Sequence, residues 1–187
     1  MVNISIKLAI TMIGLIIASG CTLTAVQYQT DFNVVNSLKD NEIQNLSVGD
    51  FESVDKSVEN LSMRGSSMVT SFDGSYAGYL KNALIEQLQQ SFLFHEEANI
   101  VISGTLLAND IDASGFSIGT ADIVAQFIVT KENHEIYNKD HSIQHQWDSS
   151  FVGSIAIPNA QNNYPIAVQK LIAVFLTDPE FIKVVHK

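Results

Sequence analysis

Residues 121–130 read ADIVAQFIVT, and apolar side chains recur at every second position from Ile123 to Val129, which predicts a β-strand. Ile123, Ala125, Phe127 and Val129 would lie on one side of this strand, and the residues between them on the other. A strand with an apolar side needs a second layer to cover it. The segments on either side of residues 121–130 decide how the sheet is completed.

Two further strands are predicted next to it, at residues 99–112 and 135–149. The connections 113–119 and 131–134 are short, so the three strands should form an antiparallel meander. The last strand is polar, as is typical of a sheet edge, where charge discourages unwanted pairing. A fourth strand is predicted at residues 45–51. It would join the sheet beside the strand to which the helix that follows it returns the chain.

Apolar residues three and four positions apart predict a helix from about Ser75 to Phe92, with Phe92 as the last member of its apolar stripe. Ser75 or Asp73 can cap its start. A second helix should begin at Tyr164-Pro165, and a short last helix should follow Asp178-Pro179. Residues 151–158 remain open between strand and loop. The order β-α-β-β-β-α predicts an α+β two-layer sandwich, in which a largely antiparallel four-stranded sheet carries two helices on one face.

The first 21 residues have a different pattern. Leu8 to Ala18 is an uncharged and mostly apolar run, too short for a membrane-spanning helix, which needs ~20 residues. It fits the apolar region of a secretory signal. Ser19 and Gly20 then precede Cys21, the only cysteine of the chain.

This ending resembles the lipobox of bacterial lipoprotein precursors, with Ala18 where Leu is more common. The resemblance implies that residues 1–20 are removed as a signal peptide and that Cys21 carries the lipid. Thr22, in a position where Asp favours the inner membrane, implies the periplasmic face of the outer membrane. The alternative is a buried Cys21 behind an ordinary signal peptide.

Residues 21–44 are polar and lack sustained periodicity, so we expect a lipid-anchored tether with one short ordered piece at 32–35. Residues 45–187 would then form a single domain.

Composition excludes some partners. The chain has 187 residues, a net charge of −10, 46% hydrophobic and 16% charged residues. The hydrophobic content is high enough to build a core. The negative net charge opposes binding to nucleic acid and a polybasic contact with anionic lipid. With Cys21 lipidated, no cysteine remains for a disulfide within the chain. We expect a membrane contact through the lipid, and no nucleic acid.

The segment 52–73 is rich in Ser, Gly and Asn and predicts a long loop. Met63, Arg64, Met68 and Phe72 are apolar or basic residues in these polar surroundings. If exposed, they would form a partner-binding patch. If folded inward, they would close the core of the domain.

A calcium site is the strongest candidate for chemistry. Residues 110–115 read DIDASG, with Asp110, Asp112 and Ser114 at the first three ligand positions of a calcium loop and Gly115 at its sharp turn. The pattern then fails, because Ala121 stands where the bidentate Glu is needed. Asp and Gly also favour ordinary turns, so we predict no metal site here.

No catalytic set emerges from the sequence. His141 and His145 lie on one side of their strand but about 13 Å apart, too far for a shared zinc ion, and we expect them to be solvated. Residues 74–78 read GSYAG, with Ser75 one position too early for a nucleophile elbow. The sequence therefore predicts neither an enzyme nor a cofactor.

The order of elements gives a second resemblance, carried by Tyr79-Leu80 and Ala83-Leu84 on the helix and by Ile102-Ser103-Gly104 on the next strand. It is similar to small envelope lipoproteins, among them auxiliary lipoproteins of ABC-type transport systems and the outer-membrane lipoprotein of the lipopolysaccharide translocon. The resemblance implies a non-catalytic binding or assembly accessory of an envelope machine, with a protein partner. The first alternative is a periplasmic carrier of a lipid or other apolar ligand. An enzyme comes third, and it would need Asp110, Asp112 and a histidine to cluster.

Overall fold

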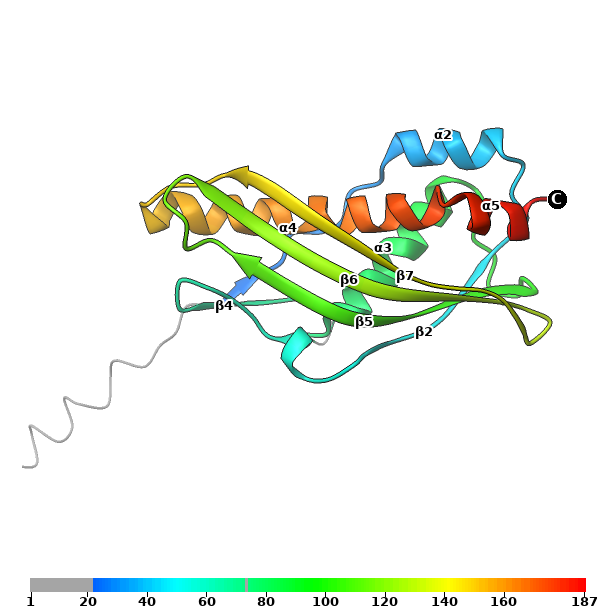
Figure 1. The fold of residues 1–187 in the computed structure, drawn as a ribbon, viewed down its shortest axis with the longest axis horizontal. Coiled ribbons are helices and arrows are strands. Elements are labelled where there is room, and N and C mark those ends of the chain that lie inside the picture. The colour runs from blue at the N-terminus through cyan, green and yellow to red at the C-terminus, as the bar shows by residue number, and fades with distance from the viewer. Residues whose placement is uncertain (1–21, 73) are drawn as a thin grey trace, which may run out of the picture.

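The computed structural model describes residues 22–72 and 74–187 (Figure 1). The predicted signal peptide and Cys21 lie outside the described residues. The strands are β1 (Thr22–Thr24), β2 (Ser47–Ser53), β3 (Leu61–Met63), β4 (Ser66–Val69), β5 (Ile100–Asp112), β6 (Ile118–Lys131) and β7 (His134–Asp148). The helices are α2 (Phe32–Asp40), α3 (Tyr76–Gln90), α4 (Gly153–Leu176) and α5 (Pro179–Val185), with a 3-10 turn η1 (Ser57–Glu59).

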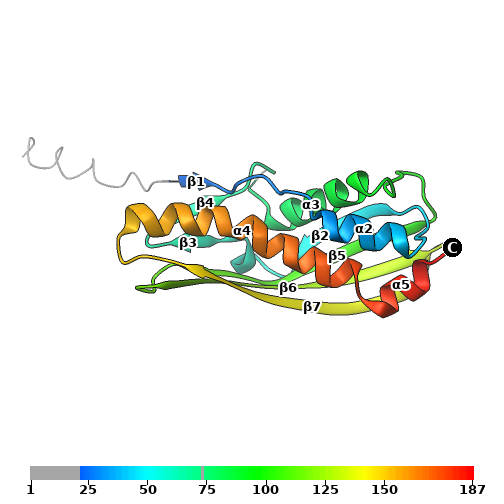
Figure 2. The same ribbon diagram turned by 90° about the horizontal axis from the view of Figure 1, so that it is seen from above.

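The main sheet has the strand order β2-β5-β6-β7. β5, β6 and β7 form the predicted antiparallel meander, and β2 joins it by parallel pairing with β5. Helices α2, α3 and α4 lie on one side of this sheet (Figure 2). The α+β two-layer prediction is therefore confirmed, and β7 is an edge strand as expected.

The core lies between this sheet and its helices. One of the two predicted sides of β6 is buried, and it carries Ile123, Ala125, Phe127 and Val129. Phe127 stacks on Phe175 of α4 with ring centroids 4.1 Å apart. Phe181 of α5 packs on Phe175 at 4.6 Å. Full burial of one such side chain contributes about 1.5–3 kcal/mol, so these rings are a main source of stability.

Helix α3 begins where predicted. Ser75 Oγ accepts a hydrogen bond from the amide of Gly78 (3.0 Å), and the carboxylate of Glu59 in η1 accepts one from the amide of Ala77 (3.2 Å). The helix ends before its predicted last residue. Phe92 has φ +59° and is 83% exposed, so its inclusion in the buried stripe was wrong.

Helix α4 begins eleven residues before the predicted start at Tyr164. The open stretch 151–158 contributes its first turns, and both Pro158 and Pro165 lie inside the helix. Because proline lacks a backbone donor and favours a helix start, Pro165 gave a misleading boundary. Asp178 caps α5, as its position predicted, by accepting a hydrogen bond from the amide of Glu180 (2.8 Å).

The predicted tether is wrong for residues 22–44, which pack onto the domain. β1 pairs in parallel with β4, and Val34, Val35 and Leu38 of α2 are buried. Tyr28 Oη donates a hydrogen bond to Gln87 Oε1 of α3 (2.7 Å). These contacts are long-range, which is why a segment without strong periodicity looked unstructured in the sequence.

Among the described helices, none is both long and apolar enough to cross a bilayer.

The packing of α2 can be tested with two substitutions in that helix. Leu38→Ala should lower the free energy of unfolding by about 2–5 kcal/mol, because Leu38 is fully buried. Phe32→Ala, at a site 68% exposed, should change it by no more than about 0.5 kcal/mol. Urea unfolding of both variants measures the difference. Equally small changes in the free energy of unfolding of both variants would contradict the packing of α2 and support a tether at residues 22–44.

Candidate functional site

The four residues predicted as a partner-binding patch do not form one. Met63 and Met68 are buried, because β3 and β4 form a short hairpin whose inner side faces the core. Phe72 is half-buried and packs edge-on against Tyr79 (6.1 Å). The exposed alternative is thus wrong for the two methionines, and residues 52–72 are a folded part of the domain.

Arg64 has a different position from its neighbours. It forms the two-residue turn between β3 and β4 with Gly65, and both residues have positive φ, +52° and +81°. Such a turn matches the twist of a hairpin but is rarely built on arginine. It directs the Arg64 side chain away from the core and toward two loops at one end of the molecule.

The Arg64 guanidinium donates hydrogen bonds to backbone carbonyls of both loops. In the β5–β6 loop, Nε donates to Ala113 O (2.7 Å) and Nη2 to Gly115 O (3.2 Å). In the β7–α4 loop, Nη1 donates to Phe151 O (2.5 Å) and Nη2 to Ser150 O (2.7 Å). The planar fork of arginine suits this arrangement, which holds the two loops together.

The loops joined by Arg64 carry the main exposed apolar cluster of this end. We call it the aromatic tip, and it consists of Phe116, Ile118, Phe151, Val152 and Ile155. Phe116 and Phe151 are 76% and 68% exposed, and their rings stack at 5.1 Å with 9° between the planes. Two stacked phenylalanines in water are costly unless something covers them, so the tip is a candidate binding surface.

No local pattern in the sequence predicts the aromatic tip. Phe116 stood in a Gly/Ser turn region, and Phe151 opened a stretch of undecided structure. One signal was present in the sequence. Phe116 and Phe151 each lie in a connection between predicted elements, where no periodic pattern requires an apolar side chain.

The two histidines of β7 are buried, and their predicted solvation was wrong. His145 Nε2 lies 2.9 Å from Asn163 Oδ1, and its Nδ1 lies 2.9 Å from Lys170 Nζ. Burial lowers the pKa of His145 and the charge of Lys170 lowers it further, although the hydrogen bond with Asn163 opposes this. A neutral ring can donate to Asn163 and accept from Lys170, so His145 links the sheet to α4.

His141 has a similar role nearer to α5. Its Nε2 lies 2.6 Å from Tyr137 Oη, and burial lowers its pKa while the carboxylate of Asp178 opposes the shift. Lys139 Nζ donates to Asp178 Oδ2 (2.8 Å), which caps α5. Lys139 therefore links β7 to the start of α5, whereas the contact between His141 and Tyr137 lies within β7.

The cluster required for the enzyme hypothesis is not formed. Asp110 pairs with Asp122 in register and lies on the side of the sheet away from the helices, whereas the two β7 histidines lie beneath them. Asp112 Oδ1 accepts from the amide of Ser114 (2.7 Å), as in an ordinary turn. Within residues 22–72 and 74–187, no three metal-ligating side chains come together.

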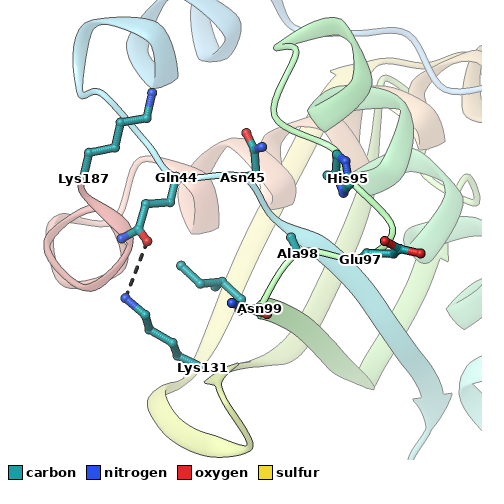
Figure 3. Close-up of a pocket in the computed structure, with 9 residues that line it drawn as sticks. Gln44, Asn45, His95, Glu97, Ala98, Asn99, Lys131 and Lys187 are labelled. Carbon is teal, nitrogen blue, oxygen red and sulfur yellow. Dashed lines mark hydrogen bonds between the residues drawn. The ribbon is translucent and has the colours of Figure 1, made fainter.

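An open pocket of about 510 Å³ lies near the C-terminus (Figure 3). Lys131, Lys187 and His95 line it together with Glu97. Lys131 Nζ donates to Gln44 Oε1 (3.5 Å). This is a wide surface depression with positive charge at its rim, and no catalytic pair is assembled in it.

A solved structure of another protein shares the fold of this chain. No family model matches the chain, and no curated protein does so either. A Xanthomonas campestris protein of the family DUF330 has the same fold, with a TM-score of 0.58 over 83% of this chain and 94% of that protein, at 9% identity. A minor lipoprotein from Acinetobacter baumannii is more distant, with a TM-score of 0.41 at 10% identity, over 72% of this chain and 90% of the other. At these identities, the likeness to the first protein defines an architecture and not an activity.

The role of Arg64 can be tested by hydrogen exchange. In Arg64→Ala, amides of residues 113–117 and 150–152 should exchange faster, because their loops lose a shared donor, with a stability loss of about 1–3 kcal/mol. Arg64→Lys keeps the charge but not the fork, so it should restore little of the protection. Unchanged exchange in both variants would show that the loops hold their conformation without Arg64.

Proposed function

We propose that the protein is a lipid-anchored envelope lipoprotein that acts without catalysis as a binding or assembly accessory of an envelope machine. The lipid on Cys21 would attach it to the periplasmic face of the outer membrane. The support for the anchor is the sequence before Cys21, with its apolar run and the two small residues Ser19 and Gly20. Several acyl chains on one residue would hold such a protein stably, whereas a single chain would not.

The observation that carries the proposal is the position of β1. This strand begins at Thr22, one residue after Cys21, and pairs with β4 at once, Thr22 opposite Ser67. Neighbouring Cα atoms are about 3.8 Å apart, so an anchor on Cys21 would hold the folded domain directly against the membrane. A domain seated in this way stays close to the membrane surface, which suits an accessory that meets a partner there.

The surface available to a protein partner is the side of the main sheet away from the helices, which we call the outer face. Thr105, Gln126 and Asp140 form a row across it on β5, β6 and β7. An antiparallel sheet tolerates a wet face, so this surface needs no cover for stability. Asp110 and Asp122 make it acidic, which favours a partner with basic side chains.

The carrier alternative has less support among the described residues. A carrier of this fold would hold its ligand between the sheet and the helices, but Phe127, Phe175 and Tyr164 are buried there as parts of the core. We therefore keep the accessory role as the proposed function.

The anchor is tested by replacing Cys21. Cys21→Ser should leave an uncleaved or mislocalised precursor, because the thiol that would carry the lipid is absent. The measurement is fractionation of cells into membranes and soluble fractions, with the mass of the mature protein. Normal membrane recovery of the variant would contradict a lipoprotein, and Ser19→Ala serves as a matched small-residue control.

The partner surface is tested by position-specific photo-crosslinking in intact envelopes. A crosslinking residue at Gln126, on the outer face, should capture a defined envelope protein. The same residue at Gln89, exposed on α3, should not capture it. An added Asp140→Lys substitution should weaken the capture, because it reverses the charge directly opposite Gln126 on β7. Equal capture at both positions would contradict a role for the outer face.

A further inference from the structure

We infer that the aromatic tip lies in the lipid–water interface of the membrane that carries the anchor. This inference rests on the proposed lipid at Cys21, and it adds a second membrane contact made by the folded domain itself. The contact would fix how the domain stands on the bilayer.

The tip and the start of the described chain lie at the same end of the molecule. Thr22 pairs with Ser67, which stands three residues from Arg64, and Arg64 binds the carbonyl of Phe151. Figure 1 shows β4, the first turns of α4 and the β5–β6 connection together at the end opposite the C-terminus. An anchor at Cys21 would therefore bring the stacked phenylalanines close to the bilayer without any rearrangement.

The chemistry of the tip suits a lipid surface. The loops belong to two stretches without a charged residue, 113–121 and 149–169, in a chain that is 16% charged. Asp112 and Asp148 stand at the inner borders of these stretches and would remain in water, which limits how deep the tip can enter. Aromatic side chains at this depth cover apolar surface at the edge of the hydrocarbon.

Arg64 lowers the cost of removing the loops from water. A backbone carbonyl without a hydrogen bond is expensive in lipid, because no water replaces its partner. Arg64 donates hydrogen bonds to the carbonyls of Ala113, Gly115, Ser150 and Phe151. These four carbonyls therefore keep a hydrogen-bond partner when the loops leave water. The same side chain explains why the two phenylalanines are held side by side.

The size of the tip favours lipid over protein as its occupant. A stable protein interface buries about 800 Å² on each partner and uses roughly 20–30 residues a side. The tip has only five apolar side chains, which come from two loops and from the first residues of β6 and α4. Beside an existing anchor, full burial of even one phenylalanine would favour the docked orientation by about 10- to 150-fold.

The test uses the mature, lipidated protein in vesicles of phosphatidylethanolamine and phosphatidylglycerol. Because Cys21 is blocked by its lipid, a cysteine introduced at Ser117 is the only thiol that reacts with an environment-sensitive fluorophore. Ser117 is exposed beside Phe116. A second protein carries the label at Asn133, in the turn at the other end of β6, roughly 45 Å away at 3.4 Å per residue. Nitroxide groups on the lipids near the headgroups then quench any label that lies in the interface.

We expect a blue shift and strong quenching at Ser117 and neither at Asn133. Phe116→Ser with Phe151→Ser should abolish the quenching at Ser117, while the protein stays on the vesicles. The matched control, Phe32→Ser with Phe92→Ser, removes two equally exposed phenylalanines from other elements and should leave the quenching unchanged. Circular dichroism confirms that each variant is folded.

The remaining outcomes separate the two proposals. Lipidated protein on vesicles with an unquenched label at Ser117 would overturn the tip contact and leave the anchor intact. Quenching that survives loss of both phenylalanines would also overturn it, because the anchor alone would then explain the proximity. An unmodified Cys21 with protein free in solution would overturn both.

Discussion

The stacking of Phe127 on Phe175 joins the sheet to its helices, and the position of the candidate site follows from it. Phe175 lies near the end of α4, so this contact fixes one end of a 24-residue helix about 36 Å long. The other end then reaches along β6, whose 14 residues span roughly 45 Å. Two elements of similar length therefore finish at the same end of the molecule, where their connecting loops meet.

The elements that the sequence predicted were those decided by a local pattern. The alternation of residues 121–130 gave β6 and its buried side, and the stripe on residues 76–88 gave α3 with its cap at Ser75. Both patterns arise because one side of the element is buried and the other is not. Such a pattern is visible in the sequence whichever elements cover the buried side. The parallel pairing of β2 followed from the helix between it and β5, since a crossover returns the chain in the same direction.

The predictions that were wrong concern elements that no local pattern decides. Helix α2, the buried methionines of the β3–β4 hairpin and the buried histidines of β7 all depend on contacts with distant segments. The same holds for the candidate site. Arg64 is separated by 49 residues from Ala113 and by 87 from Phe151, the residues whose carbonyls it binds. No spacing rule connects these positions, whereas the pattern that led to the lipidation hypothesis at Cys21 is local to residues 8–21.

The distribution of charge separates the two surfaces of the molecule. A net charge of −10 opposes binding to anionic lipid, so any contact of the domain with a bilayer must be apolar and must lie where acidic residues are absent. The stretches 113–121 and 149–169 meet that condition, and Arg64 gathers them at one end. The outer face of the sheet carries Asp110, Asp122 and Asp140 instead, and it runs along the length of the molecule. A domain that stands on its apolar end would hold this acidic face away from the lipid, where repulsion from anionic headgroups reinforces the orientation set by the anchor.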